Sequence, residues 1–161
     1  GCRMIGTVGT KEKAELAMEN GCEFIINYKE EIISEKVMEI TKNKGVPVVY
    51  DGVGKDTFDE SIKSLSTRGL MVSFGQSSGM VEKIDMHKTF NPKSLFYTRP
   101  SLMGYTLNRE ELINCSNKLF EKMKNKDVNP NIYKKFKLNE AEKAHIILQS
   151  RESSGSIILE P

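Results

Sequence analysis

The sequence has few of the residues from which metal centres and disulfide frameworks are built. Its 161 residues include three cysteines and two histidines. Cys2, Cys22 and Cys115 are widely spaced and form no Cys-x-x-Cys pair, which argues against a zinc site, a dithiol redox motif and a disulfide framework. This use of cysteine is typical of a reducing compartment, so we expect a cytoplasmic protein that holds no metal.

Long apolar runs and an excess of one charge are also absent. No window reaches the roughly 18 apolar residues that a membrane helix needs, and the first residues lack the apolar stretch of a secretory signal. Lysine and arginine number 24 against 22 acidic residues, which gives a formal net charge of +2. The composition therefore indicates a globular protein without a membrane partner and does not favour nucleic acid.

Short apolar runs alternate with amphipathic stretches through the first half of the chain. Strands are predicted over residues 3–8, 23–27, 46–51 and 70–74, with helices over 11–20, 30–44 and 57–67 between them. Because each strand returns to the same edge through a helix, the strands must pair in parallel. The pattern predicts an α/β fold with a doubly wound parallel sheet.

The second half of the chain has a different pattern. We expect a polar loop over 75–94, an edge strand broken by Pro100, a long helix over 109–126, a strand over 134–138, a helix over 139–151 and a strand over 156–160. The helix over 109–126 should bury Leu112, Ile113, Leu119 and Met123. Asn139 and Glu142 are spaced as an N-cap with an acidic third residue, which predicts where the next helix begins.

The residues that follow each strand are the candidates for ligand binding, because the carboxyl ends of parallel strands meet the amino ends of helices there. A Gly-x-Gly-x-x-Gly turn is not visible. If residues 3–8 are the second strand of a dinucleotide fold, its ribose site carries Gly6 and Gly9, with Lys13 close behind and no carboxylate at the strand end. Such a site suits a 2′-phosphate and favours NADPH over NADH, although a lysine such as Lys13 on a surface helix is more often simply solvated.

Several stretches carry a family resemblance, namely IGTVGTKEKAE, INYKEE, VVYDGVGKDTF, RGLMVSFGQSSG, SLFYTRPSLMGY and AHIILQSRESSGSIIL. Together they run through the whole chain. In this order they resemble the second half of the quinone oxidoreductases among the zinc-free medium-chain dehydrogenases/reductases, a group that includes the zeta-crystallins.

The resemblance implies cofactor contacts at seven positions: Lys13 at the 2′-phosphate, Tyr28 at the adenosine, Val53, Phe74 and Gly75 along the cofactor, and Thr98 and Arg99 near the nicotinamide. It also implies hydride transfer from NADPH to a quinone or enone. No catalytic residue is assigned as a proton donor, and no metal ligand is assigned.

The resemblance implies that residues 1–130 form part of a Rossmann-like NADP-binding domain and that residues 131–161 belong to a GroES-like catalytic domain. Because the glycine-rich turn and the first half of the family pattern are missing, and the chain opens on Gly1, we expect a fragment that is inactive by itself. A homodimer through the edge strand near Leu95 to Leu102 is also expected. Two alternatives stay open: another zinc-free enone reductase, and a non-enzymatic crystallin-like or RNA-binding module.

Overall fold

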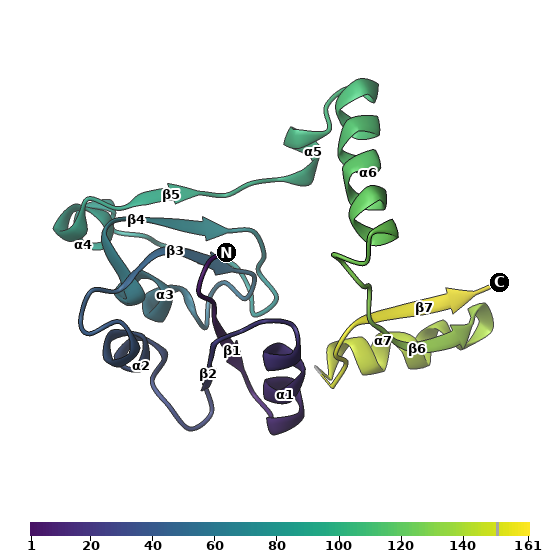
Figure 1. Ribbon diagram of the computed structural model, residues 1–161, viewed down its shortest axis with the longest axis horizontal. Helices are drawn as coiled ribbons and strands as arrows, with labels where there is room; N and C mark the ends of the chain where they lie inside the picture. Colours follow the sequence, from purple (N-terminus) through teal and green to yellow (C-terminus); the bar gives the residue numbers. More distant parts are fainter. Residues whose placement is uncertain (151) are drawn as a thin grey trace. The chain divides into compact units, whose positions relative to one another are not determined.

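The computed structural model describes residues 1–150 and 152–161, which divide into two compact units, Gly1–Gly104 and Tyr105–Pro161 (Figure 1). The elements of the first unit are β1 (Ile5–Val8), α1 (Lys11–Glu19), β2 (Phe24–Asn27), α2 (Ile33–Ile40), β3 (Val46–Asp51), α3 (Phe58–Ser64), β4 (Leu65–Ser73), α4 (Met86–Phe90), a 3-10 turn (Asn91–Lys93) and β5 (Phe96–Thr98). The short helix α5 (Leu102–Tyr105) runs into the second unit, which holds α6 (Arg109–Lys124), β6 (Ile132–Lys137), a 3-10 turn (Leu138–Glu140), α7 (Ala141–Gln149) and β7 (Ser156–Glu160).

Every strand pair among residues 1–150 and 152–161 is parallel, which confirms the predicted α/β class. The first unit contains two sheets, β1–β2 and β3–β4–β5, and the second contains the pair β6–β7. The sequence predicts one doubly wound sheet, whereas the strands of the described residues leave β1 and β3 unpaired with each other. The expected sheet is therefore present in two parts.

The first helix begins and ends where its capping residues predict. The hydroxyl of Thr10 accepts a hydrogen bond from the backbone N–H of Lys13 at 3.3 Å, and Gly21 follows the helix with a φ of +97°. The second helix is shorter than predicted, because Lys42 and Asn43 adopt left-handed backbone angles that end it soon after Ile40.

The core of the first unit lies between α3, α4 and the three-stranded sheet. Phe58, Leu65, Met71 and Phe90 form its buried centre, and Val49 packs against them. The ring of Phe90 also meets that of Tyr97 edge to face, with the ring centroids 5.7 Å apart. This packing fixes β3, β4 and β5 as one layer.

Two predictions within the first unit are wrong. The third helix ends at Ser64, because Leu65 already has extended backbone angles and residues 65–69 join β4 through an irregular register with β3. The expected polar loop over 75–94 contains α4, whose first turn is capped by the carboxylate of Asp85 accepting from the N–H of Lys88. A five-residue helix is too short to leave a clear periodic signal.

The second unit buries little of its surface. Leu112, Ile113, Leu119 and Met123 of α6, predicted to be buried, are 37% to 50% exposed, because no residue of this helix is packed into a core. The helix starts with a capping box in which Asn108 and Glu111 each accept from the other's backbone N–H, a feature that the sequence reading missed.

The predicted cap at Asn139 is wrong, since that residue lies inside a 3-10 turn and α7 begins after Glu140 without a side-chain cap. The predicted end of this helix at Arg151 lies outside the described residues. None of the described helices is both long and apolar enough to cross a membrane. The two compact units divide after Gly104. The boundary expected after residue 130 is of another kind, since it separates a cofactor-binding domain from a catalytic domain, and it stays a prediction.

Candidate functional site

Two loops at the carboxyl ends of β3 and β4 are bonded to each other along their length. The N–H groups of Phe74 and Gly75 donate to the carbonyl of Asp51, and that of Ser78 donates to the carbonyl of Val53 at 2.9 Å. The Ser78 hydroxyl donates to the same Val53 carbonyl at 2.8 Å. The two loops therefore form one double loop, residues 51–56 with 74–79, at the edge where parallel sheets bind ligands.

The buried carboxylate of Asp51 holds the loop over residues 51–56 in place. Asp51 is 4% exposed, and its side chain accepts from the N–H groups of Val53 at 2.8 Å and Gly54 at 3.0 Å. The hydroxyls of Thr57 and Ser61 donate to the same carboxylate at 2.8 Å. Burial opposes ionisation, but these donors together outweigh it and lower the pKa of Asp51 below its ordinary value. The charged carboxylate thus fixes the turn and the start of α3.

Glycine is required where the two loops touch. A Cβ on Gly75 would lie 2.8 Å from the Cα of Gly52, and a Cβ on Gly52 would lie 2.9 Å from the ring of Phe74. Since a real Cβ does not approach backbone so closely, Gly75 needs glycine for packing, whereas a Cβ on Gly52 would have to displace the Phe74 ring. The Phe74 ring covers Gly52 and remains 58% exposed, which leaves an aromatic surface at the strand ends.

A small cavity of about 120 Å³ lies beside the double loop. It is lined by Gly54, Ser73, Gly75, Gln76 and Arg99, among others. The guanidinium of Arg99 donates to the side-chain oxygen of Gln76 at 2.7 Å, which ties the end of β5 to the loop after β4. A larger hollow of about 490 Å³ lies along α2 and Lys63, away from these strand ends, and presents Glu35 and Glu39, which do not suit an anionic cofactor.

The turn after β1 carries a second group of candidate residues. Tyr28 follows β2, and its ring lies over Gly9, where an added Cβ would meet the ring at 2.7 Å. Lys13 lies in the first turn of α1, so its position is tied to the cap at Thr10. Gly6 lies inside β1, opposite Ile25, where an added Cβ would meet the sulfur of Cys22 at 3.0 Å.

The structure therefore brings the eight candidates into two groups. Val53, Phe74, Gly75 and Arg99 meet at the double loop, and Thr98 lies in register with Val72 of β4. Lys13 and Tyr28 lie at the turn after β1, whereas Gly6 has a packing reason of its own. The sequence reading missed Asp51 as a structural centre, although an acid directly before Gly-x-Gly at a strand end was the available signal.

The donor groups do not suit a metal ion. Within residues 1–150 and 152–161, no three side chains of His, Cys, Asp or Glu gather where they could hold one. His87 and His145 lie in separate units of the molecule. The described residues therefore do not fit a zinc centre.

Comparison with known proteins gives a consistent result. Residues 1–123 match the sequence pattern of the zinc-binding dehydrogenases. The chain is 45% identical over 163 residues to Quinone oxidoreductase 1 of Escherichia coli, covering 100% of this chain and 50% of that protein. It is 42% identical over 162 residues to 2-haloacrylate reductase of Burkholderia, covering 100% and 49%.

Solved structures agree with the sequence matches. The crystal structure of Escherichia coli quinone oxidoreductase complexed with NADPH superposes with a TM-score of 0.93 at 46% identity, over 99% of this chain and 49% of that one. The chain thus spans about half the length of the relatives that it matches.

Proposed function

Because the chain belongs to the zinc-binding dehydrogenase family, we propose that it forms the cofactor-binding part of an NADPH-dependent quinone oxidoreductase. The observation that carries the proposal is the double loop around Gly52 and Gly75, built at the carboxyl ends of parallel strands in a chain 46% identical to a quinone oxidoreductase solved with NADPH. An NADPH molecule bound there would supply a hydride for a quinone.

The residues of this chain would bind and orient that cofactor. Lys13 would pair with the 2′-phosphate, and Tyr28 would lie beside the adenosine. Val53, Phe74 and Gly75 would lie along the dinucleotide. Because Gly75 has no side chain, the cofactor could approach its backbone closely. Thr98 and Arg99 would face the nicotinamide end, where Arg99 is already held by Gln76. Gly6 would lie near the ribose of the cofactor.

A second substrate class has support from one relative. The 2-haloacrylate reductase of Burkholderia is 42% identical, and its name describes reduction of an activated alkene. An enone is therefore the alternative acceptor for the same hydride transfer. We propose a quinone as the first choice of acceptor, because the relative in Escherichia coli that is 45% identical to this chain is named a quinone oxidoreductase.

We further propose that the protein works without zinc, in the cytoplasm, and as a homodimer. The outer edge of β5 pairs with no other strand of the described residues, so a second copy could pair along the segment from Leu95 to Leu102. Sedimentation at micromolar concentration tests this proposal, and a monomer would contradict it.

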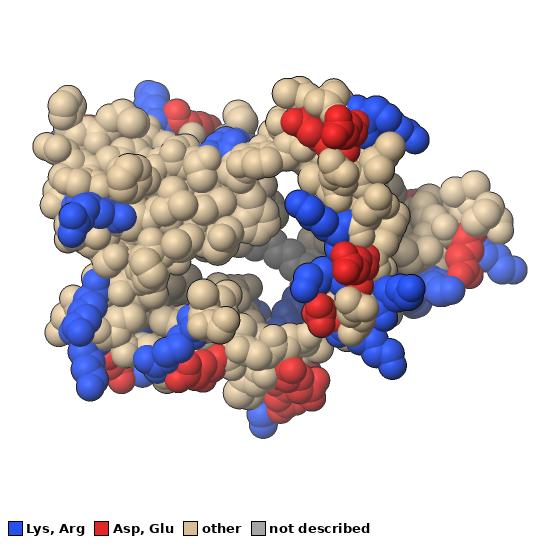
Figure 2. Space-filling view, turned by 45° about the horizontal axis from the view of Figure 1, so that its top comes forward, with Lys and Arg blue, Asp and Glu red and all other residues tan. Residues whose placement is uncertain are grey.

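A non-enzymatic RNA-binding role has less support. Figure 2 shows acidic and basic side chains intermixed on the face that it draws, rather than an uninterrupted basic surface. With a net charge of +2, the chain has little of the electrostatic attraction on which binding to phosphate backbones depends.

Titration with 2′-phospho-AMP and with AMP tests the cofactor proposal. We expect 2′-phospho-AMP to bind at least about tenfold more tightly, and Lys13→Ala to remove that preference. Lys44→Ala is the matched control, since Lys44 is exposed and lies two residues before β3, at the opposite edge of the sheet. Equal affinity for the two nucleotides, or an unchanged preference in Lys13→Ala, would contradict the assignment of NADPH.

A further inference from the structure

The cavity beside the double loop is lined by side chains that donate hydrogen bonds. Ser73 at the end of β4, Arg99 directly after β5 and Gln76 all line it. Among the described residues, no Asp or Glu does so. The polar part of this cavity therefore offers many donors and few acceptors. The cavity is called the donor pocket below.

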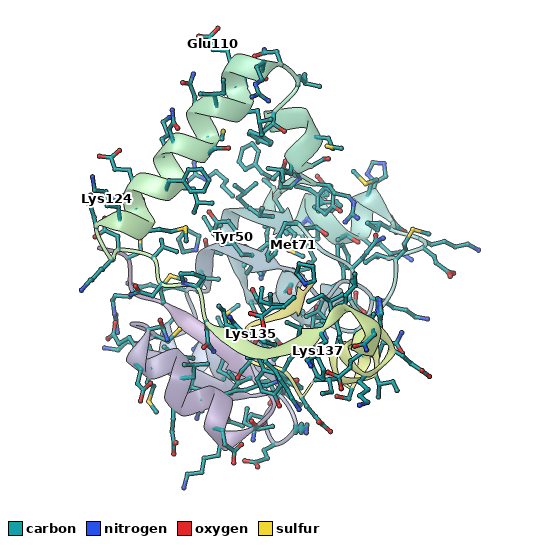
Figure 3. The ribbon with its side chains drawn as sticks, turned by 90° about the vertical axis from the view of Figure 1, so that its right-hand side faces the viewer. Tyr50, Met71, Glu110, Lys124, Lys135 and Lys137 are labelled. Carbon is teal, nitrogen blue, oxygen red and sulfur yellow. The ribbon has the colours of Figure 1, made fainter. Side chains whose placement is uncertain are left out.

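The pairing of β4 with β5 brings two of these donors together. Val72 pairs in parallel with Thr98, so Ser73 and Arg99 come next along neighbouring strands. Because side chains alternate along a strand, Ser73 lies on the same face of β4 as the core residue Met71, which is labelled in Figure 3. The donor pocket thus lies at the carboxyl ends of parallel strands, where such sheets bind ligands.

The hydroxyl of Ser73 is buried at this pocket. Ser73 is 3% exposed, and its oxygen accepts from an N–H of Arg99 at the long distance of 3.5 Å. Within residues 1–150 and 152–161, the hydroxyl itself donates to no acceptor. Buried polar groups nearly always have hydrogen-bond partners, so this hydroxyl needs an acceptor from outside the chain.

The guanidinium of Arg99 also lacks an acidic partner. It donates to the side-chain oxygen of Gln76 at 2.7 Å and to Ser73, both of which are neutral. None of the ion pairs in the described part of the chain includes Arg99. A guanidinium has five N–H groups, so donors remain beyond these two bonds. Because Arg99 is exposed, an anion can reach it from the solvent and pair with it.

The other walls of the donor pocket are largely apolar. Val81, Ile84 and Tyr97 line it, and the first two also pack against the core. Its volume of about 120 Å³ is that of roughly four water molecules. A free phosphate presents oxygens on every side and would place some of them against apolar walls. A short carboxylic acid has one end that bears oxygen and an apolar remainder, so it fits this pocket better.

We propose that the donor pocket binds the carboxylate of a small α,β-unsaturated acid that accepts the hydride. The inference rests on the proposed function and narrows its second substrate class to alkenes that carry a carboxylate. Arg99 and Ser73 hold the two carboxylate oxygens, and Gln76 keeps the guanidinium in place. The hydride adds to the β-carbon and a solvent proton to the α-carbon, so NADPH and the unsaturated acid become NADP⁺ and the saturated acid.

Titration of the 161-residue chain with propionate and with propionamide tests the proposal. Propionate is the saturated product of the smallest such acid, and propionamide has the same shape without the charge. Binding is followed by NMR, through the backbone amides of Gly75 and Gln76 and the side-chain N–H of Arg99. We expect propionate to bind at least about tenfold more tightly than propionamide, and inorganic phosphate to bind more weakly than propionate.

Two substitutions separate the charge from the hydroxyl. Arg99→Gln should reduce the affinity for propionate at least about tenfold, and Ser73→Ala should reduce it about threefold. Arg109→Gln is the matched control, since Arg109 is exposed at the start of α6 in the second unit. The amide spectrum of each variant shows whether it folds like the parent chain. If Arg99→Gln does not, Ser73→Ala decides the outcome.

Three results would overturn the proposal: equal affinities for propionate and propionamide, tighter binding of phosphate than of propionate, or an unchanged affinity for propionate in the folded variants. The second result would assign the pocket to a phosphate group. The preference for 2′-phospho-AMP depends on Lys13 in the turn after β1 and should persist in Arg99→Gln. Loss of that preference in the parent chain would contradict the proposed function, whereas the three results above contradict the carboxylate site alone.

Discussion

The two ends of the candidate site are held in very different ways. At the carboxyl ends of β3 and β4, a buried carboxylate accepts from four donors and two loops are bonded together along their length. At the end of β1, the turn is held by hydrogen bonds that include those from the Lys13 N–H to the Thr10 hydroxyl and from the Tyr28 N–H to the Val8 carbonyl, and by the ring of Tyr28 over Gly9. The first end is built around a buried carboxylate, whereas the second is built from a helix cap and a covering aromatic ring.

This difference assigns different parts to the two ends. A loop built around a buried carboxylate binds a ligand with little loss of conformational entropy, and we expect a turn held by a helix cap to lose more. The double loop should therefore set the position of the dinucleotide. The turn after β1 should respond to the 2′-phosphate. The predictions that follow test this contrast from its strongest point to its weakest.

Removing the buried carboxylate should have the largest effect. We expect Asp51→Ala to lower the free energy of unfolding by about 3 kcal/mol, because four donors lose their acceptor in a buried place. The loss should be measured by urea unfolding. Asp56→Ala is the control, since Asp56 is exposed and only its backbone contacts Ser78, so a change within about 0.5 kcal/mol is expected.

The same carboxylate predicts a dependence of stability on pH. Since the pKa of Asp51 is lower in the folded chain than its ordinary value, its contribution is complete above about pH 4 and is lost as the pH falls toward the folded value. Asp51→Ala should therefore lose stability less steeply than the parent chain below pH 4. Parallel curves for the two proteins would contradict the assignment.

The contact between the loops should give the next largest effect. Gly75→Ala would push a methyl group against the backbone of Gly52, and we expect it to cost about 2 kcal/mol. Gly104→Ala meets nothing within 4 Å and should change stability by less than about 0.5 kcal/mol. Equal effects of the two substitutions would show that the double loop is looser than its hydrogen bonds indicate.

A smaller effect is expected where the two sheets of the first unit are linked through their helices. Glu60 accepts from Ser34 of α2 and Lys63 of α3, and although burial opposes it, these partners lower the pKa of Glu60 to about 2. Glu60→Gln should cost about 1 kcal/mol at pH 7. That contribution is present above about pH 4.3 and is lost as the pH falls toward 2, so parent and variant should converge in acid.

Glu35→Gln is the control for this link, because Glu35 is exposed on the same helix as Ser34. Urea unfolding at pH 7 and pH 3 separates the two variants. If Glu35→Gln costs as much as Glu60→Gln, general charge on α2 rather than the bond to Ser34 explains the effect.

Much of the fold followed from local sequence signals. Local signals predicted the strands around residues 5–8, 24–27 and 46–51, because the alternation of apolar residues acts within a few positions. The two ends of α1 were predicted for the same reason, from Thr10 before the helix and Gly21 after it. The end of α3 was not, because Leu65 satisfies the helical spacing and is also the buried residue that starts β4. Tertiary pairing with Val46 decides its conformation.

The candidate site was predictable in location but not in construction. The rule that ligands bind at strand ends identified the segments containing Val53 and Gly75 from sequence. The role of Asp51 depends on Thr57 and Ser61 turning back from α3, which no local pattern reveals. The exposure of α6 was also missed, since an amphipathic pattern shows which side of a helix is apolar and not whether anything packs on it.

The smallest effect is expected at the turn after β1. Thr10→Ala should cost about 1 kcal/mol, because the first turn of α1 loses one accepted hydrogen bond, and Thr10→Ser should restore it. Amide exchange should quicken in α1 and stay unchanged in the double loop, which has its own hydrogen bonds. A loss from Thr10→Ala that exceeds the loss from Gly75→Ala would reverse the contrast. The turn after β1 would then be the more firmly built end, and Lys13 would be held in place before any nucleotide arrives.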